Sequence, residues 1–232
     1  MESRVVLGLL LIGLPIAFNV LFLALGRSFD YPDILRRETG EILTRFTSGG
    51  TRLVVTWWAF MLTALALTPV SALLAVQLAP AGQSLALTSL AMGVAASLVQ
   101  ALGLLRWPFL VPVLARRHAE ASSDAERATV ALVFEAVHRY LGVAVGEHLG
   151  YLLTGAWTAV VGLALIVSPA APDLLGWLGL LLGTALIVGS LEFVGRAGPR
   201  GWTVAERLVP IAYTAWAIWL LALGVALVLE LS

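Results

Sequence analysis

The chain has 232 residues, of which 60% are hydrophobic and only 12% are charged, and its mean hydropathy is +0.96. Because a soluble domain carries roughly a quarter charged residues, this composition excludes an ordinary soluble enzyme and indicates an integral membrane protein. The 14 basic residues, all Arg, balance 14 Asp and Glu, so no overall basic field recruits nucleic acid. Cysteine is absent, which excludes disulfides, thiolate catalysis and cysteine-ligated metals.

Six stretches are long and apolar enough to span a bilayer, since a spanning helix takes about 20 apolar residues. They lie at about 5–26, 53–79, 84–105, 141–167, 174–195 and 208–229. The fold class predicted is therefore all-α, with residues 1–232 forming one transmembrane domain, a six-helix bundle whose required partner is the lipid bilayer.

The first stretch has an alternative interpretation as a signal peptide, because Arg4 precedes an apolar run ending at Gly26. That run exceeds the 7 to 15 residues of a typical signal core, and Pro15 and Asn19 interrupt it. We therefore favour an uncleaved first helix.

Positive charge alternates between the connections. Thirteen of the 14 Arg fall in three of them: Arg27, Arg36, Arg37, Arg45 and Arg52; then Arg106, Arg116, Arg117, Arg127 and Arg139; then Arg196, Arg200 and Arg207. Cytoplasmic loops near spans carry such an excess. We expect these loops inside a bacterial cytoplasmic membrane and both termini outside.

Two segments within these connections are predicted to form short interfacial helices. In residues 33–47, Leu35, Ile42 and Phe46 recur on one helical face and charges occupy the other. Residues 124–140 follow a capping box at 123–126.

The second of these segments could also continue into the fourth span as one helix. That helix would be about 66 Å long, twice the hydrocarbon thickness. Residues 124–140 must therefore lie outside the hydrocarbon, lie along its surface, or bend near Gly142 or Gly146.

Ionisable side chains in the fourth span suggest a site. Glu147 and His148 lie about seven residues inside it, where a charge is costly unless it faces a partner or water. The hypothesis is a polar, cytoplasm-facing vestibule for a ligand or a proton, made of Asn19, Arg106, His138, Arg139, Glu147, His148 and Glu192. The alternatives are that Glu147 pairs with Arg139 or Arg106, that Glu147 and His148 extend to the interface, and that Asn19, Arg106 and Glu192 are ordinary rim residues.

Small residues recur at four-residue spacing on two helices, at Gly142, Gly146 and Gly150 and again at Gly179 and Gly183. Such stripes let helix backbones approach closely, so tight packing is the favoured interpretation over a ligand channel. The same faces are candidate contacts for a homo-oligomer or a larger membrane complex.

A metal or haem site receives little support. Glu135 and His138 form an ExxH pair, as in di-iron bundles, but the sequence has no second ExxH to complete one. His138 and His148 lie too far apart along one helix to bind one haem iron. No cofactor is expected.

Three segments, 29–36, 146–150 and 210–216, resemble the bacterial multi-pass membrane proteins grouped as domain of unknown function 4386. The resemblance implies a bacterial membrane and a helical bundle. It transfers no activity and no catalytic residue.

Three functions remain open at this point. The first is non-enzymatic sensing or transport of a small ligand or proton, with sensing ahead because no inverted repeat is evident. The second is a membrane redox or metal-dependent enzyme subunit that uses Glu135, His138, Glu147 or His148. The third is a structural or assembly subunit of a membrane complex.

Overall fold

The protein is a bundle of long helices. The computed structural model describes residues 2–168, 171–194 and 202–229, which contain helices and no strand. The α-helices are α1 (Glu2–Phe29), α2 (Thr39–Leu65), α3 (Leu67–Leu78), α4 (Gln83–Phe109), α5 (Val111–Glu120), α6 (Asp124–Val137), α7 (Gly150–Val167), α8 (Asp173–Gly189) and α9 (Thr203–Val228). A π-helix, η3 (His138–Leu149), joins α6 to α7, and η1 (Asp33–Arg36), η2 (Ala79–Ala81) and η4 (Ser190–Phe193) are short 3₁₀ helices.

Six helical segments in the described ranges are long and apolar enough to cross a membrane. They are Ser3–Phe29, Thr39–Ala81, Gln83–Glu120, Asp124–Val167, Asp173–Glu192 and Arg207–Val228. The predicted all-α polytopic bundle is confirmed. Three of these segments are much longer than the predicted spans, because the helices continue past the apolar stretch into the connections.

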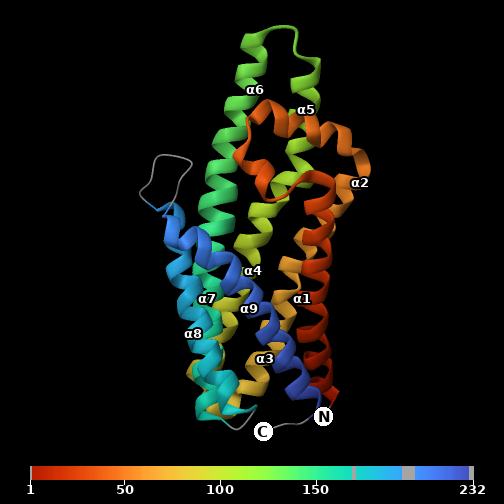
Figure 1. The fold of residues 1–232 in the computed structure, drawn as a ribbon. Helices are drawn as coiled ribbons and strands as arrows, with labels where there is room; N and C mark the ends of the chain where they lie inside the picture. The colour runs from red at the N-terminus through yellow and green to blue at the C-terminus, as the bar shows by residue number, and fades with distance from the viewer. Residues whose placement is uncertain (1, 169–170, 195–201, 230–232) are drawn as a thin grey trace.

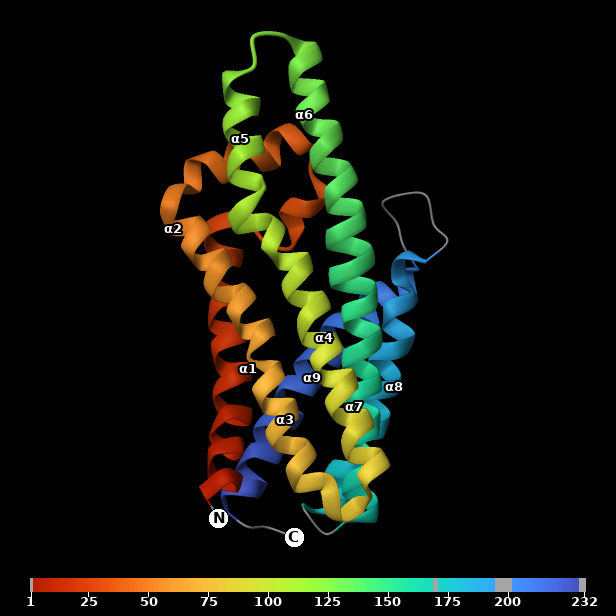
Figure 2. The same cartoon turned by 180° about the vertical axis from the view of Figure 1, so that it is seen from behind.

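The two ends of the bundle differ. Helix α1 begins and α9 ends at one end, and a hairpin of α5 and α6 projects from the other (Figures 1 and 2). The connections that hold Arg27 to Arg52 and Arg106 to Arg139 lie at the hairpin end, which we call the Arg-rich end. Of the third connection, Arg207 is described, whereas Arg196 and Arg200 lie outside the described residues.

Residues 124–140 extend from the bundle instead of lying across it. Helix α6 passes into η3 and then α7 as one continuous rod, and α6 pairs with α5 outside the bundle (Figure 2). No bend occurs near Gly142 or Gly146; the π-helix occupies that stretch. At the start of α6, Ser123 Oγ accepts from Glu126 N, while the Glu126 carboxylate accepts from Ser122 N, one residue earlier than a capping box requires.

The other predicted surface segment, residues 33–47, forms η1 and the first part of α2. Gly50, with φ 55° and ψ −155°, breaks α2 into a part that crosses the Arg-rich end and a part that enters the bundle (Figure 1). This backbone region is essentially restricted to glycine. Ile42, Leu43 and Phe46 of the first part are buried.

Glycine contacts bring the helices together. A Cβ on Gly155 of α7 would lie 2.6 Å from the carbonyl oxygen of Gly183 of α8, and one on Gly179 would lie 3.0 Å from Cα of Gly162. In a membrane there is no hydrophobic driving force between helices, so the close approach of their backbones stabilises the packing of α7 on α8. The Gly179 and Gly183 face predicted for helix packing is thus occupied by α7 of the same chain.

The core has two unlike halves. Toward the termini, buried residues are mainly Leu, Ala and Val. Toward the Arg-rich end they include a ring cluster in which Trp57 and Trp107 stack with centroids 4.5 Å apart and planes 10° apart. Phe29 meets both indoles edge-on. Of the polar side chains described next, Tyr31 and Arg106 lie beside this aromatic half.

Candidate functional site

The ionisable stretch predicted in the fourth span is a π-helix. The twelve residues from His138 to Leu149 form it, whereas π-helices are rare and usually single turns, often at functional sites. Hydrogen bonds in a π-helix run i to i+5, so successive residues turn through less than the 100° of an α-helix. The residues of this stretch are therefore distributed around the helix differently from those of an α-helix.

The glycines of this stretch face α4. A Cβ on Gly103 of α4 would lie 2.5 Å from Cα of Gly146, and one on Gly150 would lie 2.9 Å from Cγ of Gln100. Gly142 faces the Arg106 side chain. The predicted packing role of Gly142, Gly146 and Gly150 is met within the chain.

Arg106 is buried in the bundle. Its exposed fraction is 6%, its guanidinium carbon lies 5.1 Å from the centroid of the Trp107 ring, and it donates from Nη1 to the carbonyl of Gly103. Its Nε has no hydrogen-bond partner within the described residues. The alternative of an ordinary rim residue is wrong for Arg106, because a rim arginine would extend into water.

Glu147 is the acidic side chain that interacts electrostatically with Arg106. The two side chains interact electrostatically, and Tyr31 interacts with both. No direct ion pair joins Arg106 to Glu147 in the described part of the chain. Of the partners considered for Glu147, Arg106 is therefore the one whose charge it meets, through space rather than through a salt bridge.

Tyrosine hydroxyls complete the surroundings of Glu147. Burial raises the pKa of Tyr31 well above its ordinary value, with Glu147 adding to the rise and Arg106 opposing it, so Tyr31 is a neutral phenol. Tyr151 of α7 and Tyr213 of α9 pack edge-on with centroids 5.1 Å apart, and both interact electrostatically with Glu147. We call these residues, Tyr31, Arg106, Glu147, Tyr151 and Tyr213, the buried polar cluster after its buried member, Arg106; the other four are half-buried.

Sequence reasoning missed the three tyrosines. None of Tyr31, Tyr151 and Tyr213 was included in the predicted site. A signal was available for two of them, since a hydroxyl inside an apolar span needs a polar neighbour. Tyr31 gave no such signal because it precedes Pro32 in a connection.

The remaining predicted site residues divide into two groups. His148 Nδ1 lies 2.6 Å from the carbonyl oxygen of Ser190, beside η4, and Glu192 of η4 interacts electrostatically with Glu147. His138 stacks on Phe134 with planes 7° apart and lies within electrostatic range of Arg106. These three border the buried polar cluster.

Asn19 and Arg139 lie apart from the cluster. Asn19 is exposed, and its Nδ2 donates 2.8 Å to the carbonyl of Pro15 in its own helix. Arg139 is exposed and lines a groove on the outer face of η3. The vestibule predicted from seven residues thus resolves into a core of Arg106 and Glu147, three bordering residues and two outside it.

The weak metal candidates do not converge on other ligands. Glu135 Oε1 accepts a 3.0 Å hydrogen bond from Thr39, and His138 is stacked on Phe134. No group of three or more His, Cys, Asp or Glu side chains suited to a metal occurs among the residues described.

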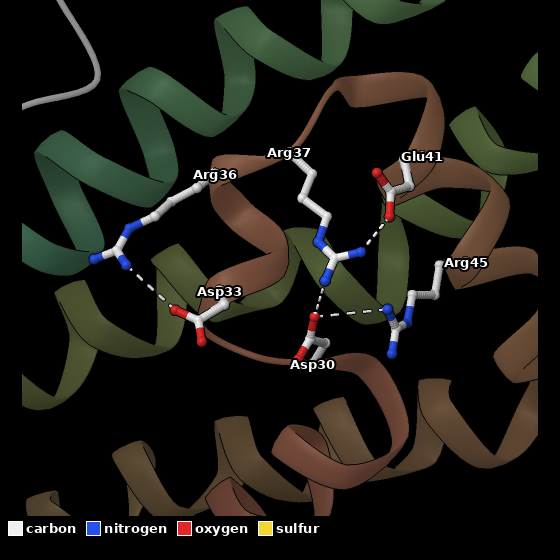
Figure 3. Close-up of polar contacts among 6 residues, drawn as sticks. All are labelled: Asp30, Asp33, Arg36, Arg37, Glu41 and Arg45. Carbon is white, nitrogen blue, oxygen red and sulfur yellow. Dashed lines mark hydrogen bonds and ion pairs between the residues drawn. The ribbon is translucent and has the colours of Figure 1, made fainter.

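Several ion pairs lie in the connection that carries Tyr31. Arg37 binds both Asp30 and Glu41, Arg45 Nη1 lies 3.6 Å from Asp30 Oδ2, and Arg36 pairs with Asp33 at 3.3 Å (Figure 3). The hydrogen bond to Glu41 is the main cause that raises the pKa of Arg37. These exposed pairs contribute little energy singly, but as a network they orient the chain directly beside Tyr31.

The long apolar helices and the ionisable side chains held between them define a multi-pass integral membrane protein of the helical-bundle class. The chain belongs to the family described as a domain of unknown function (DUF4386), whose model matches residues 6–224. This match confirms the resemblance noted in three segments of the sequence. Comparisons with curated proteins and with solved structures found no match.

Proposed function

We propose that the chain is a non-enzymatic, proton-responsive sensor of the bacterial cytoplasmic membrane, with its Arg-rich end inside and both termini outside. The observation that carries the proposal is that Arg106 is buried, that its Nε has no hydrogen-bond partner among the described residues, and that no direct ion pair joins it to Glu147 there. An ionisable residue within a span marks a functional site by default. A carboxylate without a bonded counterion changes its protonation at a lower energetic cost than one held in a salt bridge.

A proton suits this site better than a larger ligand. The groove along η3 and the groove between α5 and α6 are lined by residues outside the cluster, and Gly142 fits closely against the Arg106 guanidinium. The groups that interact electrostatically with Glu147 are Arg106 from α4, Tyr31 from the first connection, Tyr151 from α7, Tyr213 from α9 and Glu192 from η4. Uptake of one proton by Glu147 would remove its negative charge and leave Arg106 and Glu192 as the two charged groups among them.

A direct connection along the chain from this site to the projecting hairpin of α5 and α6 supports sensing over transport. Arg106 lies in the last turn of α4, just before α5, and Glu147 lies in η3, which continues from α6. The two charges are therefore attached directly to the two helices of the projecting hairpin (Figure 1). A change in their attraction would move α5 and α6 relative to the rest of the Arg-rich end.

The test is a distance measurement between spin labels in protein reconstituted in lipid. Because the chain has no cysteine, Thr44→Cys on α2 and Ala128→Cys on α6 supply the only labelling sites, and both positions are exposed. We expect the distance distribution to change between mildly acidic and mildly basic pH. The change should vanish with Glu147→Gln and persist with Glu135→Gln, a control carboxylate outside the cluster.

Two results would overturn the proposal. One is a distribution that does not depend on pH in the wild-type background. The other is a pH response that Glu147→Gln leaves intact, which would assign the proton to a different group.

A further inference from the structure

An open groove of about 430 Å³ lies on the outer face of η3. Its apolar lining residues are Ala136, Val143, Ala144 and Val194, which we call its floor. Arg139, Tyr140 and His148 also line it, and Tyr140 is 71% exposed. The groove thus combines an apolar floor with one arginine, one histidine and one tyrosine.

The groove lies between a charged and an uncharged part of the same continuous helix. Helix α6, with the exposed Asp124, Glu126, Arg127 and Glu135, belongs to the projecting hairpin, whereas α7 contains no charged residue. Arg139 lies between these two parts, and Ala144 and His148 follow toward α7. A molecule in the groove would have one end at the level of the headgroups and the other among the acyl chains.

We propose that this groove binds an anionic phospholipid of the leaflet at the Arg-rich end. The lipid phosphate would meet the Arg139 guanidinium, the Tyr140 ring would lie at the headgroup boundary, and one acyl chain would lie over Ala136, Val143 and Ala144. Basic positions between helices on the cytoplasmic side recognise anionic headgroups by charge, and aromatic side chains such as tyrosine anchor at the same level. A zwitterionic lipid would fill the apolar floor equally well but would lack the net charge.

The inference is independent of the proton site, although the two are adjacent. His148 lines the groove, and its Nδ1 atom lies 2.6 Å from the carbonyl oxygen of Ser190. Glu147, its chain neighbour, belongs to the buried polar cluster. Lipid in the groove would therefore contact the π-helix that also holds Glu147, without touching the cluster.

The test is native mass spectrometry of the full chain in detergent, titrated with phosphatidylglycerol or with phosphatidylcholine of the same acyl chains. We expect phosphatidylglycerol to bind about fivefold more tightly, the factor that one basic side chain near an anionic surface provides. Arg139→Gln should remove this preference. Arg116→Gln, an exposed arginine on α5 that does not line the groove, should retain it.

A second pair of variants tests the apolar floor. Ala144→Trp places a large side chain in the groove and should reduce binding of both lipids. If this variant does not fold, Ala136→Phe, at another lining position, should have the same effect. Equal affinity for the two lipids, or wild-type binding by Arg139→Gln, would overturn the proposal. Equally tight binding of inorganic phosphate would overturn it too, because the acyl chain would then contribute nothing.

Discussion

Gly142 of the π-helix lies directly against the guanidinium of Arg106, so that a Cβ at this position would stand 2.7 Å from Cζ and 2.8 Å from Nη2. The absence of a side chain there is what lets a buried arginine lie flat between α4 and η3. The same contact places the positive charge of Arg106 beside the element that carries Glu147.

Gly142→Ala should disturb the Arg106 side chain. The added methyl group overlaps the guanidinium, and overpacking in a close-packed interior costs about 1 to 3 kcal/mol. The measurement is reversible unfolding in mixed micelles. Gly13→Ala is the matched control, because no atom lies within 4 Å of a Cβ there; equal effects of the two substitutions would contradict the contact.

Gly103→Ala should cost more than Gly142→Ala. Its methyl group would meet backbone atoms of Gly146 at 2.5 and 3.1 Å, which cannot turn aside as a flexible side chain can. The two helices would have to separate. Unfolding under the same conditions gives the comparison, and a Gly103→Ala variant as stable as wild type would show that α4 and η3 do not approach this closely.

Arg106→Gln and Glu147→Gln should be coupled energetically. Residues that share an electrostatic network deviate from additivity by about 0.5 to 3 kcal/mol, whereas independent sites add within about 0.5 kcal/mol. A double-mutant cycle on unfolding free energy measures the coupling. Arg116→Gln combined with Glu147→Gln is the control pair, for which additive effects are expected. Additivity in the test pair would mean that the two charges do not interact.

Asp30→Asn should weaken the ion pairs that Asp30 makes with Arg37 and Arg45. The pairs are 35 to 40% exposed, so the loss of stability should be small, about 1 kcal/mol or less, and it should shrink as salt is added. Asp33→Asn, which removes only the Arg36 pair, should have a smaller effect. Thermal unfolding at low and high salt compares the loss of stability in the two variants. Equal losses that do not depend on salt would argue against a network centred on Asp30.

The sequence predicted the class of fold and the number of spans because both depend on the length and polarity of apolar runs. Six apolar stretches and three Arg-rich connections were sufficient for the bundle. The glycine contacts of Gly146 and Gly183 also followed from spacing alone, since only small residues permit that approach.

The arrangement of the site could be predicted only in part. Glu147 was identified from its cost inside a span, but the sequence did not predict that Arg106 is buried or that His138–Leu149 form a π-helix. Hydrogen-bond register is not visible in residue spacing. Tyr31 reaches the cluster from a connection, where its ring packs against Phe22, Trp57 and Phe60, and residue spacing does not reveal these contacts.

The most direct test of the account is an infrared titration of Glu147 in the wild type, Glu147→Gln and Arg106→Gln. The account predicts a protonated-carboxyl band that appears on acidification of the wild type, is missing from Glu147→Gln, and appears at a different pH in Arg106→Gln. Identical carboxyl spectra for the wild type and Glu147→Gln would contradict it, because Glu147 would then exchange no proton in the accessible pH range.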